Sequence, residues 1–150
     1  KWQVPIKIEK KFFIQKYLKS DEYGIDILND LSGKYVHHCC RKKIVIRSGD
    51  TDKAKIVKSK TFKNFAIKLS SFLKHTGIID VDFILKDKRI FILDINCRIG
   101  GGYPFTHLYG YNYIDKILSM IKSPQQKIIF PHETKNLNVF FSKGISIYKH

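Results

Sequence analysis

Two short apolar runs separated by four charged residues constrain the fold of this chain more than any other feature. IIDVDFIL (78–85) and IFILDIN (90–96) alternate apolar and polar side chains and are joined by KDKR (86–89). Alternation with a period of two is typical of half-buried strands, and a short polar connection favours a β-hairpin. The sequence therefore predicts an antiparallel pair of strands at this point in the chain.

The remaining segments indicate an α+β fold built on an antiparallel β-sheet. Strand-like runs are separated by turn-forming residues, and SGDTDKAK (48–55) is predicted as a polar loop. The further predicted strands span 12–17, 22–28, 35–47 and a last one within 139–148. Strands dominate and helices alternate irregularly with them, which favours the α+β class over a parallel α/β sheet.

Two helices are predicted from apolar side chains that recur every three to four residues. The first runs from Thr61 to His75 with Gly77 as its terminator, and the second covers 113–121. The apolar face of the first helix comprises Phe62, Phe65, Ala66, Leu69, Phe72 and Leu73. This spacing predicts an amphipathic helix.

Acidic side chains of the predicted hairpin are expected on one common face. A three-residue connection sets Asp82 opposite Asp94 and Asp80 opposite Asn96. Opposed residues have Cβ atoms about 5 Å apart, so two carboxylates repel there unless a positive charge lies between them. Mg²⁺ takes such oxygen ligands together with substrate phosphates, which makes this a candidate metal site. The alternative is that the face points to water, with a different register.

An arginine and three glycines follow the second strand of the hairpin. Arg98 continues the alternation two residues beyond Asn96, and Gly100, Gly101 and Gly102 come next. A guanidinium beside a metal suits a polyphosphate ligand, and glycines let the backbone turn sharply or approach another group closely. Arg98 thus favours the metal interpretation over the solvent-exposed one.

These motifs resemble the C-terminal part of an ATP-grasp enzyme of the carbamoyl-phosphate-synthase-like branch. DVDFILKDKRIFILDINCRIGGG (80–102) is similar to its hallmark, which is an acid, any residue, Asn-Pro-Arg and a glycine-rich loop. FIQKYLKSDEYGIDILND (13–30) resembles the hinge strand and ribose-binding segment, and IRSGDTDKA (46–54) the nucleotide-proximal loop. The resemblance runs from about Phe12 to Asn112 and implies one domain over 1–150, an ATP-grasp C-terminal subdomain.

The resemblance also implies the ligands and the residues that contact them. ATP is expected with two Mg²⁺ ions, or Mn²⁺ in their place. The implied metal ligands are Asp82, Asp94 and Asn96; phosphate contacts come from Arg98 and Arg47, the adenine edge from the backbone of Gln15 and Tyr17, and the ribose contact from Glu22. The types of group fit these roles, because Mg²⁺ prefers oxygen ligands and guanidinium groups bind phosphate.

Plainer roles stay open for three of these side chains. Glu22 is alternatively a solvated strand acid, and Arg47 a surface partner of Asp50 or Asp52. His107 either faces the pocket of the acceptor substrate or merely starts a helix.

The chain also departs from the family pattern at two positions. Asp94 stands where the family usually has Glu, which puts bridging of two metals in doubt, and Cys97 replaces the usual Pro. In the family a lysine-bearing strand and a glycine-rich flap precede the hinge, but here only KWQVPIKIEKK does. We therefore expect a part of an ATP-dependent ligase that is inactive alone, with N-terminal subdomains supplied in cis or in trans.

A complete enzyme of this kind activates a carboxylate as an acyl phosphate for attack by an amine-type nucleophile. The sequence leaves both substrates open. The net charge of +15 keeps a basic nucleic-acid-binding domain as one alternative, and a non-catalytic interaction domain as another. Specific nucleic-acid recognition is not favoured, because the lysines are scattered and the arginines are only Arg41, Arg47, Arg89 and Arg98.

Cysteine usage and apolar patterning predict a cytoplasmic protein without a membrane span. The three cysteines make an odd count that does not suit a disulfide framework. Cys39 and Cys40 follow two histidines, but neighbours on a strand point to opposite faces, so we favour ordinary strand residues over a zinc site. No apolar run approaches the roughly 20 residues that a membrane-spanning helix needs.

Overall fold

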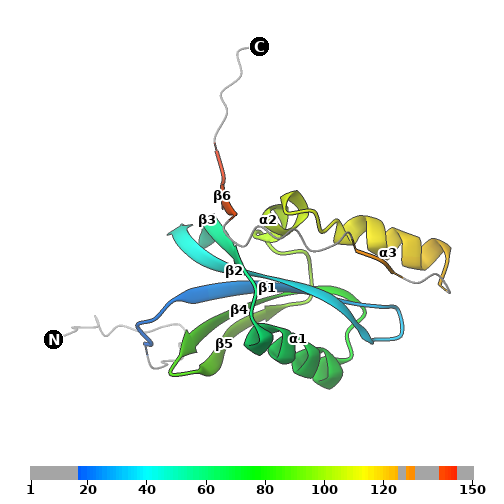
Figure 1. The fold of residues 1–150 in the computed structure, drawn as a ribbon, viewed down its shortest axis with the longest axis horizontal. Helices are drawn as coiled ribbons and strands as arrows, with labels where there is room; N and C mark the ends of the chain where they lie inside the picture. The colour runs from blue at the N-terminus through cyan, green and yellow to red at the C-terminus, as the bar shows by residue number, and fades with distance from the viewer. Residues whose placement is uncertain (1–16, 125–127, 131–138, 145–150) are drawn as a thin grey trace, which may run out of the picture.

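A twisted antiparallel sheet forms the centre of the computed structural model, which describes residues 17–124, 128–130 and 139–144 (Figure 1). Within these residues the sheet has six strands in the order β5-β4-β1-β2-β3-β6. The strands are β1 (Glu22–Asn29), β2 (Tyr35–Arg47), β3 (Asp50–Val57), β4 (Gly77–Lys86), β5 (Arg89–Asn96) and β6 (Phe140–Ser142). The helices are α1 (Lys60–Leu73), α2 (Tyr103–Leu108) and α3 (Tyr113–Lys122). The predicted α+β class and antiparallel sheet are confirmed.

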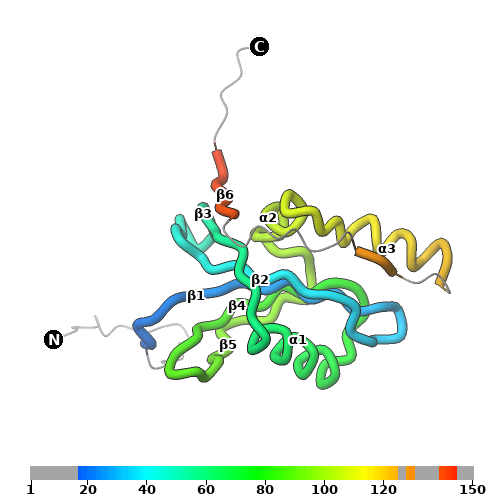
Figure 2. Tube along the Cα trace, in the orientation of Figure 1, coloured from blue at the N-terminus to red at the C-terminus, as the bar shows by residue number. Residues whose placement is uncertain are grey.

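Helices cover both faces of the sheet, α1 on one side and α2 with α3 on the other (Figures 1 and 2). Strand alternation divides the core accordingly. The cluster under α1 comprises Ile25, Ile27, Cys40, Phe62, Ala66, Leu69, Ile79, Val81 and Phe83. The cluster under α2 and α3 comprises Leu28, Cys39, Ile56, Tyr103, Tyr109, Tyr111, Tyr113 and Met120. Cys39 and Cys40 lie in different clusters, so the prediction that they point to opposite faces is confirmed.

The predicted helix at 61–75 is confirmed as α1, with slightly different ends. Ser59 caps it by accepting a hydrogen bond from Thr61 N–H at 3.1 Å, and Lys74, rather than Gly77, ends it in a left-handed conformation. Phe62, Ala66 and Leu69 are buried as predicted. Phe72 and Leu73, predicted on the same apolar face, are 83% and 36% exposed, so this face ends before them. None of the helices in the described residues is long and apolar enough to cross a membrane.

The β4–β5 hairpin has the predicted residue pairs, but its turn differs from the prediction. Its turn has two residues, Asp87 and Lys88, both with positive φ, so the predicted three-residue connection is wrong. A β-bulge at Leu93 of β5, opposite the step from Asp82 to Phe83 on β4, then shifts the register by one residue. Asp82 therefore pairs with Asp94, and Asp80 with Asn96, as the sequence predicts.

The segment predicted as a loop at 48–55 is mostly strand. Ser48 and Gly49, with φ of 50° and 82°, form a tight turn, and β3 begins at Asp50. Three side chains of β3 are buried, those of Thr51, Ala54 and Ile56. The charged residues between them obscure the strand pattern in the sequence.

Three smaller elements complete the comparison with the predicted elements. The helix predicted at 113–121 is confirmed as α3, whereas α2 was not predicted. The last strand is shorter than expected, Phe140–Ser142. The strand predicted at 12–17 lies outside the described residues apart from Tyr17.

Candidate functional site

The candidate site lies on the face of the sheet that carries α2 and α3, beside those helices, over β2, β4, β5 and the start of β3. A hollow of about 180 Å³ opens here. Polar and glycine residues line it: Arg41, Lys43, Gly49, Asp50, Thr51, Asp80, Asp82, Asp94, Asn96, Arg98, Gly101 and Gly102. The sheet thus has an apolar half under the helices and a charged half beside them.

Four predicted site residues meet in this hollow: Asp82, Asp94, Asn96 and Arg98. Asp94 is exposed, and its two carboxylate oxygens accept hydrogen bonds from Ile95 N–H and Asn96 Nδ2, each at 2.9 Å. Arg98 is exposed and donates to the Ile99 carbonyl at 3.1 Å. The structure therefore brings these four predicted residues together, and their roles stay predictions.

A lysine that the sequence analysis missed bridges Asp82 to Glu22. Lys43 Nζ lies 2.5 Å from Glu22 Oε1 and 2.8 Å from Asp82 Oδ2. The lysine side chain is only 4% exposed, whereas those of Glu22 and Asp82 are 29% and 26% exposed. Burial works against the charged ammonium, but the two hydrogen-bonded carboxylates outweigh it and raise the pKa of Lys43.

A second cation, Arg41, is fully buried beside Lys43 on β2. Its Nη1 and Nη2 each donate at 2.6 Å, to Asp26 Oδ2 and Asp80 Oδ1 respectively, and Thr106 Oγ1 donates to Asp26 at 2.5 Å. Burial, helped by the carboxylates of Asp26 and Asp82, raises the pKa of Asp80 to about 6 although Arg41 opposes the shift.

The glycine loop, Gly100 to Gly102, packs directly on this buried cluster, which leaves no room for side chains at two of its three positions. A Cβ on Gly100 would lie 2.2 Å from Asp80 side-chain atoms, and one on Gly102 would lie 2.1 Å from Arg41 Nε. The sequence analysis expected the glycines to allow a sharp turn or a close approach. The close approach is to Arg41 and Asp80, and it fixes the backbone just after Arg98 against the sheet.

Arg47 lies apart from this hollow. Its side chain is 68% exposed, and Nη2 lies 3.4 Å from Asp52 Oδ2, which matches the alternative of a surface ion pair. It lines an adjoining hollow of about 500 Å³ with Lys143, and the two hollows share Asp50 and Thr51. The structure therefore does not bring Arg47 and Arg98 into one hollow.

Two further predicted residues, Tyr17 and His107, do not line the hollow. Tyr17 is 86% exposed, and Gln15 lies outside the described residues. His107 belongs to α2, near its C-terminal end, so it does not start a helix.

The donors in the hollow fit a divalent cation in kind. Asp94 and Asn96 offer carboxylate and amide oxygens at an open surface, beside the guanidinium of Arg98. Among the described residues, no group of three or more His, Cys, Asp or Glu side chains is arranged to hold a metal. Any ion here therefore needs further ligands, such as water or phosphate oxygens.

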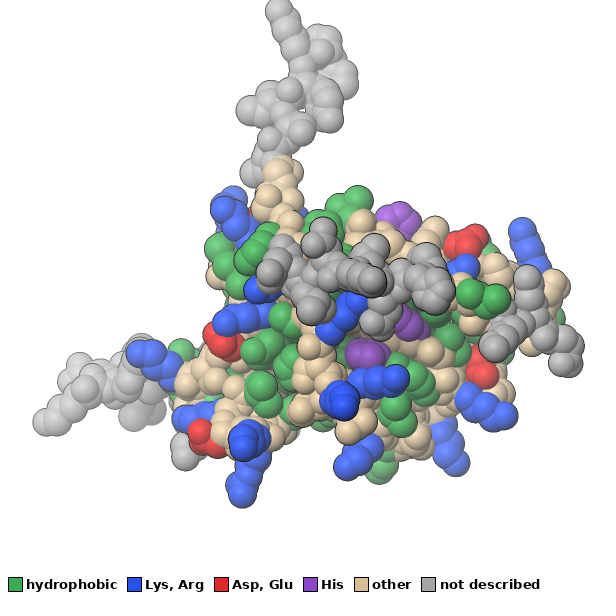
Figure 3. Space-filling view, in the orientation of Figure 1, with side chains coloured by type: hydrophobic (Ala, Val, Ile, Leu, Met, Phe, Trp, Pro, Cys, Tyr) green, Lys and Arg blue, Asp and Glu red, His purple; other side chains and the backbone are tan. Residues whose placement is uncertain are grey.

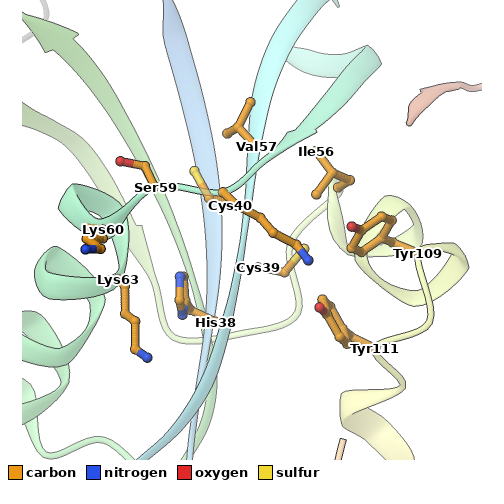
Figure 4. Close-up of a pocket in the computed structure, with 11 residues that line it drawn as sticks. His38, Cys39, Cys40, Ile56, Val57, Ser59, Lys60, Lys63, Tyr109 and Tyr111 are labelled. Carbon is orange, nitrogen blue, oxygen red and sulfur yellow. The ribbon is translucent and has the colours of Figure 1, made fainter. Parts of the chain in front are cut away.

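A larger cavity of about 370 Å³ lies elsewhere, between the start of α1 and the buried tyrosines Tyr109 and Tyr111 (Figure 4). None of its lining residues belongs to the predicted site. Basic side chains are spread over the face shown in Figure 3, with apolar side chains between them, and do not form a single patch.

Comparisons with known proteins found one matching family model and several solved structures of similar fold. A family model described as "ATP-grasp in the biosynthetic pathway with Ter operon" matches residues 9–142. None of the curated proteins gives a significant match.

Two solved structures show how much of a larger fold the chain resembles. The biotin carboxylase domain of a thermophilic 2-oxoglutarate carboxylase, bound to bicarbonate, is 15% identical with a TM-score of 0.61, over 83% of this chain and 30% of that one. Pyruvate carboxylase of Rhizobium etli, with the allosteric activator acetyl coenzyme A, is 17% identical with a TM-score of 0.50, over 60% of this chain and 9% of that one. The likeness is one of fold, and the chain spans less than a third of either structure.

Proposed function

The chain belongs to the ATP-grasp family, and from this membership we propose that it supplies the C-terminal, phosphate-facing part of an ATP-dependent carboxylate–amine ligase. The observation that carries the proposal is the hollow in which Asp94, Asn96 and Arg98 converge beside the glycine loop. Oxygen donors and a guanidinium at one open surface suit a nucleotide phosphate with its cation.

In this proposal Arg98 binds the phosphate that is transferred, and Asp94 with Asn96 holds a divalent ion, Mg²⁺ or Mn²⁺. The ion would supply charge neutralisation on the phosphate oxygens. The chain's own part is to orient Arg98, through the glycine loop seated on Arg41, and to present a fixed positive charge to the developing negative charge. The ribose contact of Glu22, the adenine contacts of the Gln15 and Tyr17 backbone and a phosphate contact of Arg47 remain predictions.

The proposed reaction has two group transfers. A carboxylate oxygen of the substrate attacks the γ-phosphorus of ATP, the bond to the bridging oxygen breaks, and ADP leaves. The amine nitrogen then attacks the acyl carbon, inorganic phosphate leaves, and the nitrogen loses a proton to solvent. Positioning and charge neutralisation carry such chemistry, and the proposal assigns no covalent nucleophile to this chain.

The partner of the site is the rest of the ATP-grasp fold, in cis or in trans. The structures that this chain resembles extend well beyond the part that it covers. We therefore propose that the isolated chain binds nucleotide weakly and has little ligase activity, because the other side of the phosphate site lies in those parts.

Thermal unfolding with millimolar MgADP tests the proposed function. The wild-type chain is expected to gain thermal stability, because a ligand that binds only the folded state stabilises it by mass action. Asp94→Ala is expected to lose the gain. Asp115→Ala is a matched control, since Asp115 lies on α3 outside the hollow and is expected to keep it.

Two outcomes would count against the proposal. An absence of any shift at millimolar MgADP contradicts nucleotide binding, and a shift that Asp94→Ala retains contradicts the site. Binding of an oligonucleotide that weakens steeply with rising salt, without any MgADP effect, would favour the nucleic-acid alternative instead.

A further inference from the structure

Lys43 is fixed in the hollow more firmly than an ordinary surface lysine. Its side chain is 4% exposed, and its ammonium contacts one carboxylate on β1 and one on β4, at 2.5 Å from Glu22 and 2.8 Å from Asp82. Holding a long flexible side chain in such a place has an entropic cost, which two short ion pairs can offset. The ammonium is therefore a permanent part of the charged face.

Strand register explains how a β2 lysine reaches an acid on β4. β1 lies between these two strands, and Gly24 of β1 pairs with Arg41 on one side and with Asp82 on the other. Gly24 has no side chain, and a Cβ there would lie 3.0 Å from Arg41 Nε, so Arg41 extends across β1 at this point. Arg41 uses the opening to join Asp26 and Asp80, and Lys43 joins Glu22 and Asp82.

The two acids of the predicted metal set consequently lie in different surroundings. Asp82 is held by an ammonium, while Asp94 is exposed and its hydrogen bonds come from neutral amide groups. A divalent ion on Asp82 would lie next to the buried ammonium and be repelled by it. The hydrogen bonds described for Asp94 come from the Ile95 N–H and the Asn96 amide, and none comes from an ammonium.

We propose that Lys43 takes the place of a metal ion at Asp82, so that this chain binds a single divalent cation, on Asp94 and Asn96. The inference rests on the proposed function and changes the expected set of ligands, because Asp82 becomes the counter-ion of a lysine. The positive charge that a second ion would bring to the phosphates comes from the protein itself.

Mn²⁺ titration of the purified chain, followed by electron paramagnetic resonance of the free ion with ADP present, tests the inference. The wild-type chain is expected to bind one Mn²⁺. Asp94→Asn is expected to weaken binding more than tenfold, whereas Asp82→Asn changes it less than threefold. The double variant Lys43→Met/Asp82→Asn removes both partners of the ion pair and is expected to behave like Asp82→Asn. Circular dichroism confirms that each variant is folded.

The possible results separate this inference from the proposed function. Equal losses in Asp82→Asn and Asp94→Asn, or two Mn²⁺ ions per wild-type chain, overturn the single-ion site and leave nucleotide binding intact. No Mn²⁺ binding by the wild-type chain in the presence of ADP overturns both. The count on the wild-type chain decides the matter even if a variant fails to fold.

Discussion

Arg41 and Lys43 make the same pattern of ion pairs, but their acidic partners differ in exposure to solvent. Each is a β2 cation that crosses β1 to bridge one acid on β1 and one on β4. The acids held by Arg41 are 0% and 9% exposed in their side chains, whereas those held by Lys43 are 29% and 26% exposed. The glycine loop closes the first cluster and leaves the second open to the hollow.

From this difference we expect Arg41 to serve mainly the stability of the fold and Lys43 mainly the proposed site. Water cannot replace Arg41 once the loop is in place, and Asp26 Oδ1 and Arg41 Nε are already buried without hydrogen-bond partners in the described residues. Lys43, in contrast, borders solvent and the predicted ligands. We therefore expect changes at Arg41 to affect folding first, and changes at Lys43 to affect ion binding first.

Arg41→Met should have the largest effect on stability. It leaves Asp26 and Asp80 buried without their counter-ion, and breaking a buried ion pair from one side costs about 3–5 kcal/mol. Urea denaturation measures the loss. Arg89→Met, at an exposed position on β5, is the control and should change the unfolding free energy by less than about 0.5 kcal/mol. Similar small changes in both variants would contradict a structural role for Arg41.

Gly102→Ala should be the next most damaging change. The new Cβ would lie 2.1 Å from Arg41 Nε, so the loop or the guanidinium must move, at a cost of about 2–3 kcal/mol. Gly144→Ala is the matched control, because a Cβ there meets nothing within 4 Å. Equal stability of the two variants, in the same urea titration, would show that the loop does not rest on Arg41.

The pH dependence of stability should reveal Asp80. Its pKa of about 6 in the folded state exceeds the value of about 4 in unfolded chains, so the folded state holds more protons between these values. Its contribution is present below pH 4 and is lost as pH rises through 6, by about 2–3 kcal/mol. The difference in unfolding free energy between wild type and Asp80→Asn should change over this window; a constant difference would show that the pKa is not raised.

Lys43→Met should destabilise the fold less than the changes at Arg41 and Gly102. Glu22 and Asp82 are partly exposed and can take up water, so we expect a loss of about 1 kcal/mol, clearly less than for Arg41→Met. Lys42→Met removes a more exposed ion pair with Asp21 and should cost less than about 0.5 kcal/mol. A loss at Lys43 as large as at Arg41 would remove the distinction between the two clusters.

Local patterns in the sequence predicted the parts of the fold that depend on local physics. Alternation located β4 and β5, and helical spacing located α1. The pairing of Asp82 with Asp94 was also predicted, although it results from a shorter turn and a bulge that compensate each other. A bulge leaves little signal in a single sequence, because it changes pairing and not composition.

The sequence predicted residues of the hollow on β4, β5 and the loop after them but missed Arg41 and Lys43 on β2. Strand order explains the difference. The acids of the hairpin are close in sequence, so spacing alone could join them. Arg41 and Lys43 reach these acids across β1, and this requires the order β4-β1-β2, which a hairpin pattern does not contain. The one available clue was Gly24, a glycine inside a strand, which marks a place where another group approaches closely.

Paramagnetic broadening by MnADP in an amide spectrum of the chain tests the central claim most directly, because it shows where the phosphates bind. We predict that amide signals of Asp94 to Gly102 broaden first, while those of α1, on the opposite face of the sheet, persist. Broadening centred on the start of α1, or none at millimolar MnADP, would contradict the account.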